Sequence, residues 1–382
     1  MPIILNTDNV FEYLTALDYC NLTDRATSSI EVIPAKNFNL LITFADGRSL
    51  LVKQELYNYQ GHAKGEFWSV WRIQQLLENF PELNDKISIF LPKLLYFDAS
   101  NSILVVNYLT DYCDLYIYYT REYNFSVAIA TAIGQLLATI HSHTFQRAEY
   151  ADFFEDRSYP GTSYSASNII HRFDRITPQV FRMVPQECLQ FFKLYQRFPS
   201  LSAAIFDLGE SIAPSCLVHN DLKINNILLD LSWDRPGSTV IRLIDWERAN
   251  WGDPAFDLGC ILGSYLEIWL AGLVISDTLS ISESLQLATT PLELIQPSLS
   301  ILVKTYLAGF PAIITTRPDF LDRVIQFTGL SLVKRVNITI EKDRVFGDRG
   351  IIMLQVGKQL LCNPQAGIST LFGKNFTQLI IN

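Results

Sequence analysis

The sequence predicts an α+β fold in which antiparallel strands dominate the first part of the chain and helices dominate the rest. Alternating apolar residues and tight-turn signals are concentrated in residues 30–109, whereas residues 126–382 contain long apolar patterns with helical spacing. With 382 residues, of which 49% are hydrophobic, the chain exceeds one ordinary domain and can bury a substantial core.

The first part of the chain is predicted to begin with a helix at residues 9–17, followed by a hairpin at residues 39–55. The two apolar runs of the hairpin flank Asp46-Gly47, a pair that favours a tight turn. Residues 65–80 have the apolar spacing of a helix, and residues 87–109 contain two further strands.

Two charged residues of this region are candidate partners, and one of them, Glu66, lies where an unpaired charge would be costly. Lys53 ends the second run of the hairpin, and Glu66 lies on the apolar stripe of the helix at residues 65–80. We therefore expect Lys53 to form an ion pair with Glu66. Glu55, on the same strand as Lys53, is the alternative partner.

The rest of the chain is predicted to be mainly helical. Residues 126–144 form an apolar helix with a small-residue face, and further helices are expected at residues 291–307 and 350–361. Residues 258–275 are almost long and apolar enough to span a bilayer, but Glu267 in their middle would be costly there. We therefore predict a buried core helix.

The most informative residues form a polar loop between two apolar segments. His219, Asp221 and Asn226 have the spacing H-x-D-x-x-x-x-N, Lys223 lies within the loop, and Asp245 ends the following apolar run. Phosphoryl transfer from a magnesium nucleotide needs a carboxylate at the acceptor hydroxyl, an amide and a second carboxylate on the metal, and a cation near the moving group. The alternative is a polar hairpin whose Asn and Asp side chains only close turns.

Residues 217–259 resemble the aminoglycoside phosphotransferase and choline kinase branch of the protein-kinase-like fold. This branch typically has an H-G-D-type loop, an I-D-[WF]-E strand end and a G-D-P-x-x-D-L turn, and this chain has VHNDL, LIDWE and GDPAFDL. The resemblance implies a two-lobed fold with an antiparallel-sheet N-lobe over residues 1–109 that binds ATP or GTP. Residues 110–382 would form a mainly helical C-lobe that carries out catalysis and binds the acceptor.

The resemblance also assigns roles to single residues. Asp221 would be the catalytic base, and Lys223 would neutralise charge on the transferred group. Asn226 and Asp245 would be the Mg²⁺ ligands. Two residues would brace the catalytic loop: His219 and Asp257.

The same resemblance implies a nucleotide site in the first lobe. Lys53, held by Glu66, would contact the α- and β-phosphates, and backbone groups near Asn107 and Leu109 would hydrogen-bond the adenine edge. Residues 21–33, where the phosphate-binding glycine-rich loop is expected, contain no glycine.

Other departures concern regulation and the acceptor. Lys223 matches the Ser/Thr protein kinases, whereas Asn220 stands where those kinases have Arg. The short interval between Asp245 and Asp257 leaves no room for a regulatory activation loop. Residues 145–215 form a long insertion with five basic residues in its middle: Arg172, Arg175, Arg182, Lys193 and Arg197. These residues either bind an acidic acceptor or a leader peptide, or they are ordinary solvated residues.

The acceptor remains open between two classes. NDLKINNILL and GDPAFDLG are similar to the kinases of class V lanthipeptide and thioamitide pathways, which implies transfer to Ser or Thr of a ribosomal precursor peptide before elimination by a separate lyase. The alternative acceptor is a small molecule of the aminoglycoside or choline type. A third hypothesis is an inactive nucleotide-binding scaffold.

Composition limits the partners and the compartment. The net charge of −9 and the pI of about 5.1 argue against binding to nucleic acid. The N-terminus lacks the basic start of a signal peptide, and the 6 cysteines lack metal-site spacing. We therefore expect a cytoplasmic protein without disulfides and without membrane association.

Overall fold

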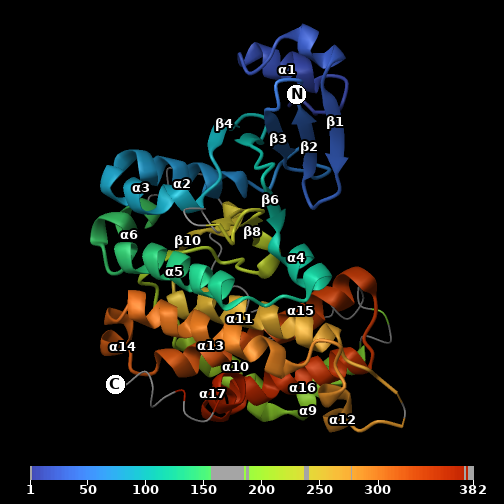
Figure 1. Ribbon diagram of the computed structural model, residues 1–382, viewed down its shortest axis with the longest axis vertical. Coiled ribbons are helices and arrows are strands. Elements are labelled where there is room, and N and C mark those ends of the chain that lie inside the picture. The colour runs from blue at the N-terminus through green and yellow to red at the C-terminus, as the bar shows by residue number, and fades with distance from the viewer. Residues whose placement is uncertain are drawn as a thin grey trace. The chain divides into compact units, whose positions relative to one another are not determined.

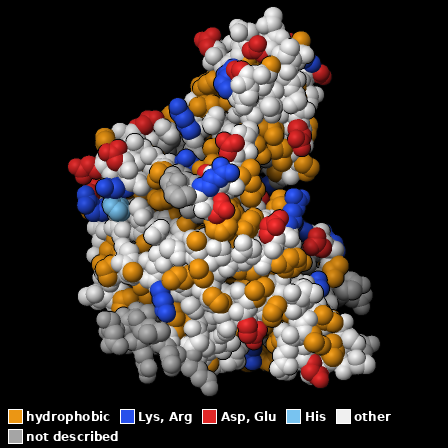
Figure 2. Space-filling view, in the orientation of Figure 1, with side chains coloured by type: hydrophobic (Ala, Val, Ile, Leu, Met, Phe, Trp, Pro, Cys, Tyr) orange, Lys and Arg blue, Asp and Glu red, His pale blue; other side chains and the backbone are white. Residues whose placement is uncertain are grey.

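The computed structural model describes residues 2–155, 185, 189–235, 241–276, 278–373 and 376. The chain forms two compact units (Figure 1). The first contains the residues up to Cys113 together with Leu228–Ala249, and the second contains most of the remainder. On the face shown in Figure 2, acidic and basic side chains are interspersed.

An antiparallel sheet forms the centre of the first unit. Its strand order is β1-β2-β3-β5-β4, and the strands span Ser29–Ile33 (β1), Phe38–Thr43 (β2), Ser49–Gln54 (β3), Leu94–Asp98 (β4) and Ile103–Asn107 (β5). The predicted hairpin is confirmed as β2 and β3, with Gly47 at φ +87°, a backbone conformation that glycine adopts without a steric cost. Helix α1, Val10–Ala16, contributes Val10, Phe11 and Leu14 to the core beside this sheet.

Helices and short strands complete the first unit. Helix α2 spans Phe67–Asn79 and α3 spans Pro81–Ile87, so the helix predicted at residues 65–80 is confirmed. Three short strands form a second sheet in the order β6-β8-β9, with bounds Tyr112–Asp114 (β6), Ile227–Asp230 (β8) and Ile241–Leu243 (β9). The 3-10 turn η5, Trp246–Arg248, packs against α2.

The second unit is mainly helical. Its described helices are Leu115–Glu122 (α4), Val127–Thr144 (α5), Ala148–Glu155 (α6), Leu189–Arg197 (α9), Pro199–Glu210 (α10), Pro254–Ala271 (α11), Ile281–Gln286 (α12), Leu292–Gly309 (α13), Ala312–Thr316 (α14), Phe320–Asp343 (α15), Asp348–Cys362 (α16) and Pro364–Phe372 (α17). Helix α11 packs against α15, and α5 packs against α13. Strand β7, Cys216–Val218, pairs antiparallel with β10, Asn250–Gly252.

These elements confirm the predicted α+β class and the predicted core helix. Nearly every residue of α11 is buried. In the part of the chain that the structure describes, no helix is both long and apolar enough to cross a membrane. Of the basic residues predicted for the insertion, Arg172, Arg175 and Arg182 lie outside the described residues.

Candidate active site

Lys53 is the centre of a charge cluster in the first unit. Its Nζ lies 2.7 Å from Oδ1 of Asp245 and 2.7 Å from Oε1 of Glu247. Burial alone would lower the pKa of Lys53, but the two carboxylates outweigh burial and hold the pKa above its usual value. Lys53 therefore remains charged, and Asn37 adds 3.3 Å contacts from its Nδ2 to the Glu247 carboxylate.

The predicted Lys53–Glu66 pair is wrong for this structure. Glu66 precedes the first residue of α2, and its carboxylate pairs with Lys36 from the turn between β1 and β2. Glu55 does not replace it, because its carboxylate accepts the backbone N–H groups of Gly65 (3.1 Å) and Glu66 (2.8 Å). Helical spacing correctly predicted that Glu66 is buried, but its carboxylate pairs with Lys36 and not with Lys53.

The turn between β1 and β2 also differs from the expected phosphate loop. It spans residues 34–37, after residues 21–33 in which a glycine-rich loop was sought. Residues 22–26 instead form a 3-10 turn, and β1 begins at Ser29. From this turn, Lys36 pairs with Glu66, and Asn37 contacts Glu247 of the charge cluster.

The strand expected to contact adenine is partly occupied by sheet hydrogen bonds. The N–H of Asn107 donates to the Lys93 carbonyl at 3.1 Å, and the N–H of Tyr108 donates to the Ser49 carbonyl at 2.9 Å. Leu109 is the first residue beyond these bonds. The backbone N–H of Asn107 is therefore already paired within the sheet, whereas Leu109 lies beyond these bonds.

In the second unit, the loop after β7 is held by one buried carboxylate. Asp257, 1% exposed in α11, accepts the backbone N–H of His219 at 2.6 Å and that of Asn220 at 2.9 Å. Asn220 has a left-handed φ of +62°, which Asn tolerates better than most residues. His141 is fully buried against Asp257 and Tyr306, which is a position for a structural residue.

Asp221 lies between two lysines. Nζ of Lys223 is 3.1 Å from its Oδ2, and Nζ of Lys334 in α15 is 3.8 Å from its Oδ1. The Asp221 side chain is 19% exposed, so its carboxylate is partly accessible. The backbone N–H of Asp221 lies 3.3 Å from Nδ1 of His219, which further fixes the loop.

Asn226 is oriented in a way that suits a metal ligand. Its Nδ2 donates to the Asp221 backbone carbonyl at 2.9 Å, so its Oδ1 remains as the acceptor end of the amide. Asp245 lies in the first unit, in a left-handed conformation with φ +62°, and Glu247 follows it. Carboxylate and amide oxygens are the ligands that Mg²⁺ prefers. Among the described residues, no group of three or more His, Cys, Asp or Glu forms a complete metal site within one unit.

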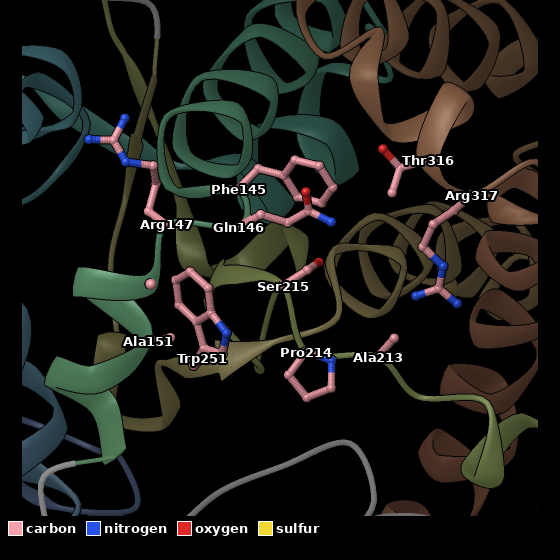
Figure 3. Close-up of a pocket in the computed structure, with 11 residues that line it drawn as sticks. Phe145, Gln146, Arg147, Ala151, Ala213, Pro214, Ser215, Trp251, Thr316 and Arg317 are labelled. Atoms are coloured by element: carbon pink, nitrogen blue, oxygen red, sulfur yellow. The ribbon is translucent and has the colours of Figure 1, made fainter.

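A cavity of about 280 Å³ lies elsewhere in the second unit (Figure 3). Trp251, Gln146 and Ser215 line it, with Arg317 on the opposite side (Figure 3). Asp221, Lys223 and Asn226 do not line it. The cavity is therefore separate from the candidate catalytic loop.

Four contacting residues were not assigned from the sequence. Glu247 is part of the LIDWE segment, and that motif was the signal that could have revealed it. No sequence signal places Lys36 beside Glu66, Asn37 beside Glu247 or Lys334 beside Asp221, because these contacts depend on tertiary packing.

Comparisons with known proteins show the family of this chain. Residues 69–279 match the model of the phosphotransferase enzyme family. A 4-hydroxytryptamine kinase of Psilocybe cyanescens is 24% identical over 183 residues, which are 46% of this chain and 47% of that protein. The chain thus matches about half the length of this curated relative.

Solved structures share the fold at low sequence identity. An ethanolamine kinase of Plasmodium vivax has a TM-score of 0.55 and 14% identity, over 93% of this chain and 89% of that one. An amicoumacin kinase solved with AMP-PNP and Ca²⁺ has a TM-score of 0.53 and 12% identity, over 92% of this chain and 91% of that one. The predicted two-lobed, protein-kinase-like fold is confirmed. Since the family model covers more than half of the 382 residues, the chain belongs to the phosphotransferase enzyme family.

Proposed function

We propose that this protein transfers the γ-phosphoryl group of ATP to the hydroxyl group of a small molecule. The observation that carries the proposal is the catalytic loop, in which Asp257 fixes the backbone and Asp221 presents a carboxylate beside Lys223. Phosphoryl transfer requires little covalent participation by the protein, so a fixed carboxylate and nearby cations supply most of what it needs.

In this mechanism, Asp221 accepts a hydrogen bond from the acceptor hydroxyl and takes its proton as the new bond to phosphorus forms. The bond from phosphorus to the β-phosphate oxygen breaks, and ADP leaves. Lys53 and Lys223 contribute positive charge to the phosphates. Asn226 and Asp245 would hold Mg²⁺, which neutralises phosphate charge when bound.

Support for a small-molecule acceptor comes from the sequence relative, which is named as a 4-hydroxytryptamine kinase. We therefore place an aromatic amine with a phenolic hydroxyl first among the acceptors to test. A Ser- or Thr-containing precursor peptide, with a separate lyase acting afterwards, is the second candidate. It draws on Lys223 and the long insertion, much of which lies outside the described residues.

The nucleotide site can be tested without knowing the acceptor. Thermal unfolding would be followed with ATP or GTP, with and without Mg²⁺, for the wild type, Asp245→Asn and the control Asp85→Asn. Asp85 is an exposed residue of α3 in the same unit. We expect Mg²⁺-dependent stabilisation of the wild type and the control, and its loss in Asp245→Asn. Equal stabilisation of all three proteins would refute the metal assignment.

Transfer itself is tested by phosphorus NMR of ATP mixed with 4-hydroxytryptamine, choline, ethanolamine or a Ser-containing peptide. A phosphate ester signal that requires Asp221 supports the proposal and identifies the acceptor class. If the nucleotide stabilises the protein but no ADP is released with any acceptor or with water, the result would instead favour the inactive scaffold.

A further inference from the structure

We propose that Lys334 is a second catalytic cation, which donates hydrogen bonds to the transferred phosphoryl group together with Lys223. This role depends on the proposed phosphotransferase function and adds to it a residue from a helix far along the chain. Lys334 belongs to α15, whereas Asp221 and Lys223 belong to the loop after β7.

The first observation is the position of the Lys334 ammonium group. It lies 3.8 Å from Oδ1 of Asp221, on the oxygen opposite to the one that Lys223 contacts. The Lys334 side chain is only 21% exposed, and no acceptor lies within hydrogen-bond distance of its Nζ among the residues that the structure describes. The ammonium group carries three donors, and it does not belong to the fully buried side-chain atoms that lack a partner, so a ligand can reach it. An anion that binds beside Asp221 would satisfy them.

The second observation is that the packing of α11 against α15 holds Lys334 in place. A Cβ on Gly259 would lie 2.5 Å from Cβ of Phe327, and a Cβ on Gly263 would lie 1.8 Å from Oγ of Ser331. These glycines let the helices approach closely. One turn further along, Glu267 of α11 pairs with Arg335 of α15 at 3.4 Å.

The catalytic loop rests on the same helix. The backbone N–H of Ile224 donates to Oγ of Ser264 in α11 at 3.0 Å, and Asp257 of α11 holds the start of the loop. Asp221 and Lys334 are thus positioned independently against α11. The distance between them is therefore a property of the packed unit, which favours a built site over a chance surface pair.

The nearby acids leave the donors of the Lys334 ammonium group available to a ligand. Glu267 already pairs with Arg335, and burial raises its pKa to about 7, so part of its population is neutral at that pH. Asp114 receives hydrogen bonds from Tyr116 and Ile117 of α4, the helix that it caps. Asp221 alone lies within 4 Å of the Lys334 ammonium group among the described acids.

In the transfer step, Lys334 and Lys223 donate hydrogen bonds to non-bridging oxygens of the moving phosphoryl group. The acceptor proton passes to Asp221, the bond to the ADP oxygen breaks, and neither lysine gains or loses a proton. Because the bonds strengthen as charge spreads over these oxygens, loss of Lys334 should lower kcat more than it raises KM for ATP.

The test measures ADP release from ATP, with 4-hydroxytryptamine as acceptor and with water alone. The proteins compared are the wild type, Lys334→Met, Lys334→Arg and Lys342→Met, the last being an exposed lysine of the same helix. We expect Lys334→Met to lower kcat about 10- to 100-fold with KM for ATP within about twofold. Lys334→Arg should recover part of the rate, and Lys342→Met should match the wild type.

Three results would overturn the role of Lys334 while leaving the proposed function intact. The first is an unchanged kcat in Lys334→Met. The second is a rate that recovers fully at higher pH, because Lys334 would then act only on the protonation of Asp221. The third is a loss of rate in Lys334→Met that parallels a loss of folded protein and is not reversed in Lys334→Arg. A wild type that releases no ADP would instead overturn the proposed function.

Discussion

The replacement of Asp257 by Asn tests the link between the buried carboxylate and the catalytic loop. The Asp257 carboxylate accepts two backbone N–H groups, from His219 at 2.6 Å and Asn220 at 2.9 Å. Asn keeps the size of the side chain, but it offers a single carbonyl oxygen to these two donors. Its NH₂ group would then face the other backbone N–H, so that two donors would point at each other.

The expected cost follows from these contacts. A hydrogen bond to a charged group contributes about 1.5–3 kcal/mol, and a buried donor without an acceptor costs about 1–3 kcal/mol. One bond survives in weaker form and the other is lost, so the free energy of unfolding should fall by about 2–4 kcal/mol. Because Asp221 lies two residues after His219, displacement of the loop should also lower kcat at least about 10-fold.

Urea unfolding and ADP release measure the two effects on the same protein. Asp343→Asn, at an exposed position in α15, serves as the control and should change neither quantity. A free energy of unfolding for Asp257→Asn within about 0.5 kcal/mol of the wild type would refute the bracing role, since surface substitutions have effects of that size.

Three further predictions concern the second unit. Burial raises the pKa of Glu267 to about 7 from a usual value of 4.5, so the folded state binds the extra proton and loses stability as the pH rises between these values. In urea unfolding, the stability of Glu267→Gln relative to the wild type should therefore increase from pH 5 to pH 7 and stay constant at higher pH. An equal difference at all pH values would contradict this. Gly259→Ala should lower the free energy of unfolding by about 1–3 kcal/mol in urea, because its Cβ would meet α15 at 2.5 Å; an unchanged midpoint would contradict this. Burial raises the pKa of the Cys260 thiol to about 12, so under native conditions a thiol reagent followed by mass spectrometry should label Cys113 and Cys362 before Cys260; early labelling of Cys260 would show that this packing opens.

The β-hairpin, the core helix and the residues of a contiguous motif could be predicted from the sequence. The Asp46-Gly47 turn could be predicted because a tight hairpin needs residues that accept a positive φ. The helix containing Glu267 could be recognised as a core helix because a bilayer penalises a carboxylate. In both cases the deciding physical term is local, and it can be evaluated from neighbouring residues alone.

Contacts between distant segments could not be predicted in the same way. The spacing of residues 65–80 identifies the side of the helix that carries Glu66, but not which cation reaches it. Lys36 does so because the turn between β1 and β2 lies beside the start of α2. Lys334 meets Asp221 because glycines let α15 approach α11, and a contact of this kind depends on packing between helices.

The ion pairs of the first unit also indicate what nucleotide binding must change. Lys53 contacts Oδ1 of Asp245 directly, and the carboxylate of Asp245 is also the proposed ligand of Mg²⁺. An ammonium group and a divalent cation compete for the same oxygen, whereas the phosphates of ATP attract both. We therefore infer that Lys53 leaves Asp245 when the metal nucleotide binds.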